Sequence, residues 1–483
     1  MPKKKITRSS KAHKEKIGTK RNNFIDTNMV KDVFGKRVIH QIAKETGFTL
    51  RRRKLDAHNF FSLVFGSLNG AVTLSALTEN VSTAISRSGI SKRFTPASCA
   101  FLQAVYSRLF SFVTACARQA SLPVRVLEAF HDIKILDSSS WKIPAALKEF
   151  FAGYNKAGCK IQFLLSYKTG SAGLQDILPE TISDQQYAKG IASRLQKDDL
   201  ILFDLGYAIP EVFHSIAARE AFFICRFNDA AMNIYLDDDP SSDPVDILVL
   251  LSTLHDRKTV YEITCFIGKR NQRTRVRLLV AKAPDEVTNR RRQKLREQSQ
   301  KKGRTPQKRS LELCAWSFLL TNIPPEKGIS FQEMFALYAI RWTIEIFFKQ
   351  LKSVLNIHKT HVKSNPDRLK AEILARSIAA LFIAHCFSLA RSDLWRRVKR
   401  EISFEKTVKY FQRHAAILTD KFLRSIHGAR AYLQQMIARI VLSCEKYRQP
   451  TRKNSLDKLL EQTLYREFKY VKLNSAKLVG LTA

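Results

Sequence analysis

The sequence lacks the cysteine patterns that mark disulfide frameworks and zinc sites. Its eight cysteines lie far apart along 483 residues, with no CxxC motif and no Cys/His pair at zinc spacing. Such isolated cysteines are typical of reduced thiols in the core of a cytoplasmic protein. We therefore expect neither a disulfide-rich secreted domain nor a zinc finger.

A long apolar segment is also missing. The N-terminus is basic, but no apolar run follows it, so the sequence predicts no secretory signal. The longest apolar run extends from Ser377 to Ala390, fewer than the ~20 residues that cross a bilayer, and an arginine flanks it on each side. We predict a buried helix there and no membrane attachment.

Acidic residues are few compared with basic ones. The chain has 43 Asp and Glu against 82 Lys and Arg, which gives a net charge of +39. Such an excess destabilises a compact protein by self-repulsion unless a polyanion neutralises it. Nucleic acid is the first candidate partner, and an anionic membrane surface or the ribosome is the second. The hydrophobic content of 45% is that of a globular protein.

The composition and the hydrophobic pattern of the sequence change several times along the chain. We expect a basic tail over 1–24, a helical DNA-binding domain over 25–124, an α/β core over 125–227 and 326–356, a β-rich insertion over 228–325, and a helical C-terminal domain over 357–483. Within the core, a hairpin is expected near 160–178. A final helix is expected over Ser455–Tyr470. The order of strands and helices predicts a mixed sheet with helices across it.

One stretch, Ser330–Leu355, has the strongest helical pattern. It contains neither Gly nor Pro, and Ser330 suits an N-cap, so we predict a single long helix. One arc of it is apolar and is expected to face the core. At ~100° per residue, the neighbouring arc carries four polar side chains within roughly 60°: Tyr338, Arg341, Glu345 and Lys352. Spacing alone favours the simpler interpretation, a solvated face whose charges pair with one another.

Two aspartates stand at the ends of apolar strands. Asp137 follows Ile133–Leu136, and Asp204 follows Leu200–Phe203. Either residue could merely initiate a turn, and Glu345 could form a surface salt bridge on its own helix. In a protein of charge +39, however, three carboxylates from two strand ends and a helix form a donor set that suits Mg²⁺ or Mn²⁺. Two such ions support phosphodiester cleavage and strand transfer.

These motifs resemble those of a known family. The spacing Tyr338-x2-Arg341-x3-Glu345-x6-Lys352, with Asp137 in LDSS and Asp204 in LFDLGY, is similar to that of the DDE transposases of bacterial insertion sequences that have a Y-R-E-K signature. The resemblance implies a ribonuclease H-like mixed sheet with a β-rich insertion, flanked by helical N- and C-terminal domains.

The resemblance also implies roles for individual residues. The side chains expected to be catalytic and to hold two Mg²⁺ (or Mn²⁺) ions are Asp137, Asp204 and Glu345. The side chains expected to hold DNA phosphates are Tyr338, Arg341 and Lys352. Trp316 would stack on a flipped base, or would simply pack in the core. The implied partners are double-stranded DNA, as transposon ends and target, and a second copy of the chain in a synaptic homodimer.

Two further features leave alternatives open. Ten Lys and Arg residues fall within Arg290–Arg309, which is expected to be either a solvated loop or a segment that follows DNA phosphates. Ser138–Ser140 follow Asp137, but no histidine is placed by a motif to activate a serine, so we exclude a serine nucleophile. The alternatives to a transposase are a metal-dependent nuclease without strand transfer and a non-catalytic DNA-binding protein on the same fold.

Overall fold

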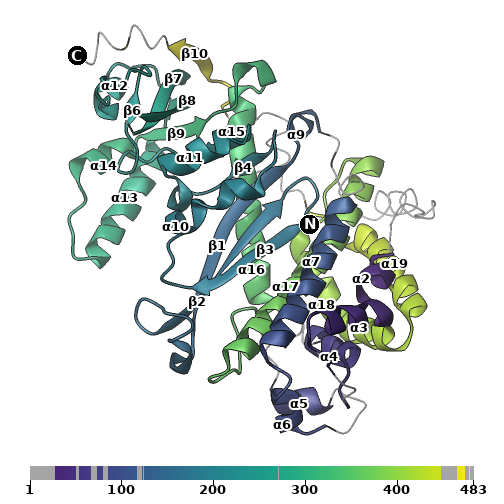
Figure 1. Ribbon diagram of the computed structural model, residues 1–483. Coiled ribbons are helices and arrows are strands. Elements are labelled where there is room, and N and C mark those ends of the chain that lie inside the picture. Colours follow the sequence, from purple (N-terminus) through teal and green to yellow (C-terminus); the bar gives the residue numbers. More distant parts are fainter. Residues whose placement is uncertain are drawn as a thin grey trace, which may run out of the picture. The chain divides into compact units, whose positions relative to one another are not determined.

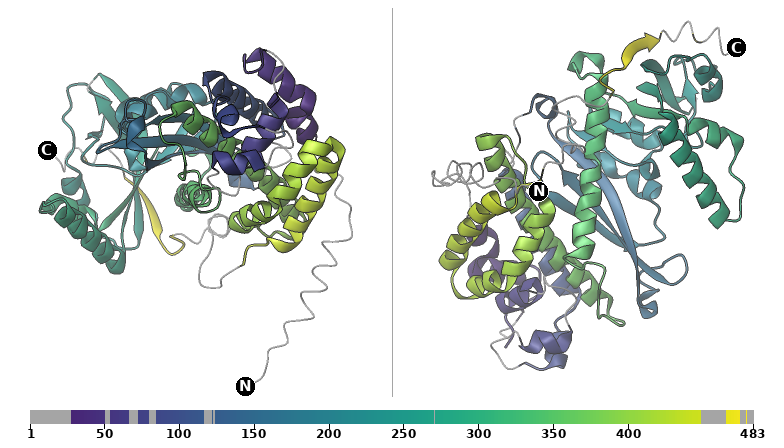
Figure 2. Two further views of the ribbon diagram at one scale, coloured as in Figure 1. Left: turned by 90° about the horizontal axis from the view of Figure 1, so that it is seen from below. Right: turned by 180° about the vertical axis from the view of Figure 1, so that it is seen from behind.

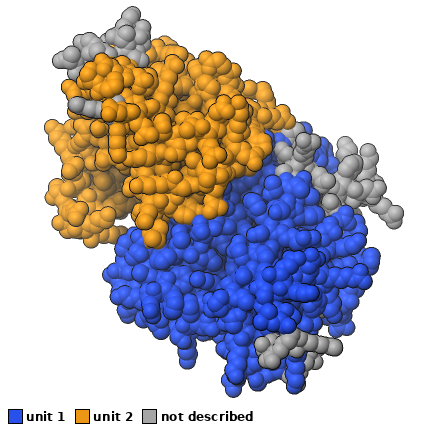
Figure 3. Space-filling model, viewed as in Figure 1, with its two compact units in different colours: residues 1–123, 138–181, 343–449 blue, residues 124–137, 182–342, 450–483 orange. Residues whose placement is uncertain are grey.

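The computed structural model describes residues 28–50, 54–66, 73–79, 85–116, 122, 124–269, 271–447, 465–473 and 478. The chain forms two compact units (Figure 3). Unit 1 comprises Met1–Pro123, Ser138–Thr181 and Thr343–Gln449, and unit 2 comprises Val124–Asp137, Ile182–Trp342 and Pro450–Ala483. Each unit therefore combines segments that are distant in sequence. The basic tail expected over 1–24 lies outside the described residues.

Unit 2 is built on a mixed sheet (Figure 1). Its strands are β1 (Ile133–Ile143, whose first part lies in this unit), β4 (Leu200–Leu202), β5 (Phe222–Cys225), β6 (Ile234–Tyr235), β7 (Thr259–Lys269), β8 (Gln272–Lys282), β9 (Trp316–Thr321) and β10 (Lys469–Leu473). Along the sheet the order is β10-β7-β8-β9-β5-β4-β1, and β6 pairs with β7. β1, β4 and β5 are parallel, whereas β5, β9, β8 and β7 alternate in direction. The expected mixed α/β sheet is confirmed.

Helices cover this sheet. They are α9 (Arg125–Glu128), α10 (Asp184–Ala188), α11 (Pro210–Ala217), α12 (Ile247–Ser252), α13 (Asp285–Lys301), α14 (Lys308–Leu313) and α15 (Phe331–Ile340). Behind β4 and β5, the rings of Phe203, Phe213 and Phe223 stack with centroids 5.9 and 4.4 Å apart. This aromatic layer accounts for the apolar runs that identified both strands in the sequence.

The inserted strands extend the core sheet directly. β9 pairs with β5 on one side and with β8 on the other. Between β7 and β8, Arg277 Nη2 lies 2.5 Å from Glu262 Oε2, and the side chain of Glu262 is only 1% exposed. This buried ion pair joins the two longest strands of the insertion.

Unit 1 combines helices from both ends of the chain with a hairpin. Its helices are α2 (Met29–Phe34), α3 (Lys36–Glu45), α4 (Ala57–Gly66), α5 (Leu74–Glu79), α6 (Arg87–Ser91), α7 (Pro96–Ala115), α16 (Trp342–Ser353), α17 (Pro366–Val398), α18 (Phe404–Arg424) and α19 (Ile426–Ser443). The antiparallel strands β2 (Ala157–Ser166) and β3 (Ala172–Pro179) form the expected hairpin. In Figures 1 and 2 the N-terminal helices (purple) lie beside the C-terminal helices (yellow-green).

The core of unit 1 is aromatic. Phe34 of α2 contacts Phe61 and Phe65 of α4, Phe382 of α17 and Phe422 of α18, with ring centroids 5.5–5.8 Å apart. The two helical regions therefore share one hydrophobic core. The predicted boundaries, which assign 25–124 and 357–483 to separate helical domains, stay a prediction. They divide the sequence, whereas helices from both regions pack around this one core.

The helix predicted around Ser377–Ala390 is part of α17. Among the described residues α17 is the one helix long and apolar enough to cross a membrane, and 94% of its apolar window is buried inside the protein. Burial on this scale identifies it as the central helix of unit 1.

The predicted helix over Ser455–Tyr470 is wrong at its C-terminal end. Residues 450–464 lie outside the described part of the chain, but Lys469–Leu473 form β10, which pairs with β7 in parallel. The ring of Tyr470 stacks on Phe331 with centroids 5.3 Å apart. Pairing with an open strand edge therefore overrides the helical spacing of this segment.

Candidate active site

Asp137 and Asp204 occupy matching positions on neighbouring parallel strands. The register of β1 and β4 pairs Ile133 with Leu200 and Ile135 with Leu202. Each aspartate follows the second pair by two residues, so both side chains face the same side of the sheet. Both carboxylates are half-buried. The structure therefore places two of the three predicted carboxylates on the same side of the sheet in unit 2.

Asp204 lies directly beside a guanidinium. Arg226 Nη2 donates to Asp204 Oδ1 at 3.1 Å. Burial would raise the pKa of Asp204, but the Leu205 amide and the guanidiniums of Arg226 and Arg341 outweigh burial and lower its pKa. Asp204 is thus ionised at neutral pH, as a ligand for a divalent cation must be.

Arg226 interacts with Tyr338 of α15 as well as with Asp204. Burial would lower the pKa of Arg226, but the neighbouring Tyr338 and Asp204 outweigh it and raise that pKa. Burial also raises the pKa of Tyr338, while Arg226 and Arg341 act in the opposite direction. Two guanidiniums, of Arg226 and Arg341, and the phenol of Tyr338 thus interact with one another beside the Asp204 carboxylate.

The sequence pattern did not point to Arg226. It directly follows β5, and the apolar run FFICRF predicted only a buried strand. The available signal was the single charge within that run. The strand β5 runs parallel to β1 and β4, which both end in aspartates. A charged residue just past the end of β5 therefore lies at the same edge of the sheet as these aspartates.

The predicted single helix over Ser330–Leu355 is wrong in one respect: the chain breaks it at Arg341. The N-cap prediction is confirmed, because Ser330 and Glu333 form a reciprocal capping box. At the break, the Arg341 amide donates to Tyr338 O at 3.1 Å, an i−3 bond that tightens the turn. The guanidinium of Arg341 is buried and lies over the rings of Tyr338 and Trp342, 5.8 and 5.6 Å from their centroids.

Glu345 and Lys352 follow the break and belong to unit 1. The apolar face of α16 is buried as predicted, with Ile344, Phe347, Phe348 and Leu351 all in the core. Glu345 is half-buried on the flank of this face. Lys352 Nζ donates to Ser140 O of β1 at 3.3 Å, and burial lowers the pKa of this ammonium.

A small basic cavity of about 460 Å³ also lies in unit 1. Its titratable lining residues are Lys142, His358, Lys359 and His361. Burial lowers the pKa of His358, and Lys359 and Lys352 add to this effect. The loop that carries the two histidines is held by α17, because Arg376 donates to Lys359 O at 2.8 Å and Thr360 donates to Glu372 Oε2 at 3.0 Å. No motif in the sequence predicted a role for this loop.

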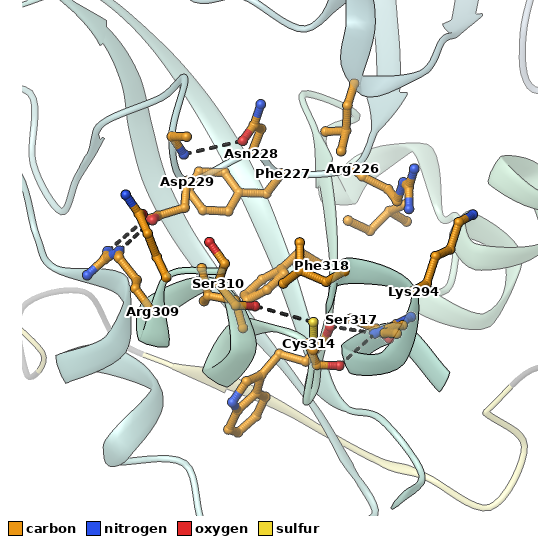
Figure 4. A pocket seen from close by; sticks show the side chains of 18 of the residues that line it. Arg226, Phe227, Asn228, Asp229, Lys294, Arg309, Ser310, Cys314, Ser317 and Phe318 are labelled. Atoms are coloured by element: carbon orange, nitrogen blue, oxygen red, sulfur yellow. Dashed lines mark hydrogen bonds and ion pairs between the residues drawn. The ribbon is translucent and has the colours of Figure 1, made fainter. Parts of the chain in front are cut away.

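Trp316 lies on the wall of a larger cavity in unit 2, of about 690 Å³. Arg226, Tyr338 and Lys294 also line this cavity, and Figure 4 shows Arg226 and Lys294 along one side of it, with Asp229 and Arg309 on the other. Trp316 is half-buried, and the Lys282 ammonium lies 5.6 Å from its ring centroid. Both interpretations of Trp316, base stacking and packing, stay predictions.

The basic segment Arg290–Arg309 is mostly helical, so the expected loop is wrong. It lies largely within α13, of whose side chains only Thr288 is buried. Two of its arginines attach the helix to neighbouring backbone: Arg291 donates to Trp316 O at 2.8 Å and Arg292 to Leu311 O at 3.0 Å. Arg309 forms ion pairs with Asp229 and Asp246. The exposed cations that remain are Arg290, Lys294, Arg296, Lys301, Lys302, Arg304 and Lys308.

The donor set fits a divalent cation in part. Two half-buried carboxylates on one face of the sheet supply the hard oxygen ligands that Mg²⁺ and Mn²⁺ prefer. Within the described residues, however, no three His, Cys, Asp or Glu side chains form a cluster that could hold a metal ion. Glu345 belongs to unit 1 and the two aspartates to unit 2. The three-carboxylate site therefore remains a prediction.

Comparison with known proteins identifies the class. The chain is 26% identical over 413 residues to the transposase of insertion sequence IS231B from Bacillus thuringiensis subsp. berliner, covering 80% of this chain and 84% of the relative. It is 24% identical over 475 residues to the IS1151 transposase of Clostridium perfringens, covering 92% and 96%. A piggyBac transposase synaptic complex with hairpin DNA matches with a TM-score of 0.42 and 14% identity, over 89% of this chain and 87% of that chain.

The protein is thus a DNA transposase of the bacterial insertion-sequence type. The family model described as Transposase DDE domain matches residues 128–382, more than half of the chain, and the chain belongs to that family. The predicted family and enzyme class are confirmed. The individual site residues remain predictions.

Proposed function

We propose that this transposase binds the ends of its own insertion sequence, cleaves them by metal-assisted phosphodiester hydrolysis and transfers the 3′ ends to target DNA. The observation that supports this most directly is the matching position of Asp137 and Asp204 on adjacent strands. Family membership supplies the reaction class. The mechanism beyond that class is our proposal.

In this proposal, Asp137, Asp204 and Glu345 are the catalytic carboxylates and hold two Mg²⁺ (or Mn²⁺) ions. The ions would activate the attacking oxygen and stabilise the leaving oxygen. The role of the carboxylates would be to hold the ions, which requires them to stay ionised. Arg226 contributes to this by lowering the pKa of Asp204.

The phosphates on either side of the scissile bond require separate contacts. Tyr338, Arg341 and Lys352 are proposed to hold them, and we add Arg226 to this proposed set because its guanidinium lies beside Asp204. An arginine presents a fork of donors to phosphate oxygens, whereas lysine acts as a point charge. Burial of the Arg341 guanidinium supports such a role, because a desolvated cation attracts phosphate more strongly than a solvated one.

The cavity that contains Trp316 is proposed to take a base flipped from the duplex. Its volume of about 690 Å³ exceeds what a stacked base requires, and its rim carries Arg226 and Lys294 for the attached phosphates. Stacking of a base on an aromatic ring contributes about 1–3 kcal/mol. We further propose that two copies of the chain act together in a synaptic homodimer in the cytoplasm.

Glu345→Gln tests the proposal. This change keeps the shape of the side chain but removes its charge, so we expect cleavage of an end-containing duplex in Mg²⁺ to be abolished while binding of the duplex is retained. A gel assay for nicked, double-strand-cut and joined products would measure this. Retained cutting by the variant would refute the role of Glu345.

The same assay separates the alternative functions. Joined products support transposition, whereas cut ends without joined products would favour a metal-dependent nuclease. Binding that does not require metal, with no turnover in Mg²⁺ or Mn²⁺, would favour a non-catalytic DNA-binding protein on this fold.

A further inference from the structure

A second cationic cavity lies in unit 1, among the N-terminal and C-terminal helices. Its volume is about 460 Å³, and its walls come from α2, α3, α4, α7, α18 and α19. Its basic lining residues other than His58 are Lys31, Lys36, Arg37, Arg108 and Arg424, and Asp32 is its one acidic lining residue. The local charge is therefore strongly positive.

Two helix N-termini add to this positive charge. α3 begins at Lys36 and α19 begins at Ile426, and both starting residues line the cavity. The amides of a first helical turn carry a partial positive charge that favours anions. Gly35 connects α2 to α3 at the cavity wall, where a Cβ would lie 2.5 Å from Lys31 O. A side chain at position 35 would therefore collide with the last turn of α2, which Gly35 caps.

Lys36 and Arg37 are placed against the preference of their own helix. The first turn of α3 has no acidic residue, and cations at a helix N-terminus destabilise it by about 0.3–1 kcal/mol each. No ion pair in the described part of the chain compensates Lys31, Lys36 or Arg37. A sequence that departs from a local folding rule in this way is expected where the residues serve a ligand.

The other basic side chains are oriented by neighbouring groups. Arg108 Nε donates to Asp32 O at 2.7 Å, and Arg424 Nε lies 2.7 Å from Asp420 Oδ1. His58 is 4% exposed. Burial lowers its pKa, which outweighs the opposing effect of Asp56, so His58 is neutral at pH 7. Arginine and lysine thus supply the side-chain charge of the cavity.

We propose that this cavity binds backbone phosphates of double-stranded DNA, so that the two helical regions together form one DNA-binding surface. The proposal rests on the proposed function, since a transposase must hold duplex DNA away from the scissile phosphate as well as at it. Cations on several helices match a polyanion better than a single small anion, because duplex DNA presents many phosphates at short spacing. Such contacts position the duplex without reading its sequence.

The double substitution Lys36→Gln/Arg37→Gln in the full-length protein tests this. We expect the affinity for a labelled duplex to fall about equally for the end sequence and for unrelated DNA. The slope of log K against log salt should decrease in magnitude by roughly 2, one for each phosphate contact removed. Thermal stability should stay equal or rise, because the substitution removes cations from a helix N-terminus.

Lys44→Gln is the matched control. Lys44 is exposed on the last turn of the same helix and does not line the cavity, so its removal should leave the salt slope nearly unchanged. Three outcomes would overturn the proposal: a double variant that binds DNA like the control, a loss confined to the end sequence, or displacement of DNA by low concentrations of inorganic phosphate at constant ionic strength, which would identify a site for a free anion.

Experiments can refute the DNA-binding role of this cavity and the proposed catalysis separately. DNA affinity and its salt dependence are measured without metal and without turnover. A wild-type protein that binds DNA through this cavity but never cuts it would refute the proposed catalysis only. A wild-type protein that cuts and joins DNA, with a double variant of unchanged affinity, would refute the cavity assignment only.

Discussion

Asp137 and Asp204 each follow the pair Ile135–Leu202 by two residues, so the two parallel strands carry their carboxylates in register. A shift of one residue in this pairing would send one of the two side chains to the opposite face of the sheet. The hydrophobic register of β1 and β4 therefore also determines where the acidic pair lies.

Replacement of Asp137 should abolish cleavage while the fold is retained. Asp137→Asn removes a metal ligand, and metal ions contribute several kcal/mol of transition-state stabilisation, so we expect a loss of about a thousandfold or more in the cleavage rate. Single-turnover cleavage of an end duplex in Mg²⁺ would measure it. Asp132→Asn, at a half-buried position just before β1, is a control that should keep most of the activity. A rate within about tenfold of wild type for Asp137→Asn would contradict the assignment.

Arg226→Met should raise the pKa of Asp204. Burial pushes this pKa up, and the change removes one of the guanidiniums that push it down. With the pKa higher, Asp204 becomes protonated at a higher pH, so activity and Mn²⁺ affinity should be lost at a higher pH as the solution is acidified. Mn²⁺ binding followed by water-proton relaxation across pH would show the shift. Identical pH profiles for the two proteins would rule out this influence of Arg226.

Trp316→Ala should impair the step that needs base stacking. We expect the fluorescence rise of a 2-aminopurine placed at the flipped position to weaken, because the ring contributes about 1–3 kcal/mol by stacking. Trp316→Phe keeps an aromatic face and should restore most of the signal. Equal behaviour of the Ala and Phe variants would argue against stacking.

Arg277→Met should strongly destabilise the insertion. It leaves Glu262 buried without its cation, a loss of about 3–5 kcal/mol. The matched control is Lys258→Met, whose partner Glu467 is 82% exposed, and which should change stability by less than about 1 kcal/mol. Denaturant unfolding would measure both. Equal effects would show that burial does not govern the strength of these pairs.

Gly35→Ala should destabilise unit 1. A methyl group there would lie 2.5 Å from Lys31 O, so the junction of α2 and α3 must shift, at a cost of about 1–3 kcal/mol. Gly428→Ala is the control: its Cβ would lie 3.5 Å from Ser425, an ordinary contact, and alanine favours the helix. Thermal unfolding of the two variants should move in opposite directions.

The sequence was sufficient to predict the strand ends that carry Asp137 and Asp204, because apolar runs that stop at an acid are a local pattern. It was not sufficient to predict their register, which depends on pairing between segments 67 residues apart (Ile133 with Leu200). Arg226 was missed because its neighbours in sequence are apolar, and its partners Asp204 and Tyr338 come from elsewhere in the chain.

Helix predictions failed where tertiary contacts outweighed spacing. No Gly or Pro near Arg341 predicts the break in the helix there. The break coincides with the buried guanidinium of Arg341, which lies over the rings of Tyr338 and Trp342. Conversely, α13 has no apolar face that would predict a helix, and hydrogen bonds from Arg291 and Arg292 to neighbouring carbonyls attach it to the protein. Both features depend on side-chain contacts that periodicity does not contain.

The pairing of β9 with both β5 and β8 has a consequence for protein engineering. Excision of the insertion would leave β5 as an open strand with unsatisfied amides and carbonyls, a template for association with other chains. A minimal catalytic core of this transposase is therefore expected to aggregate during expression unless β9 is kept or replaced by another edge-protecting strand.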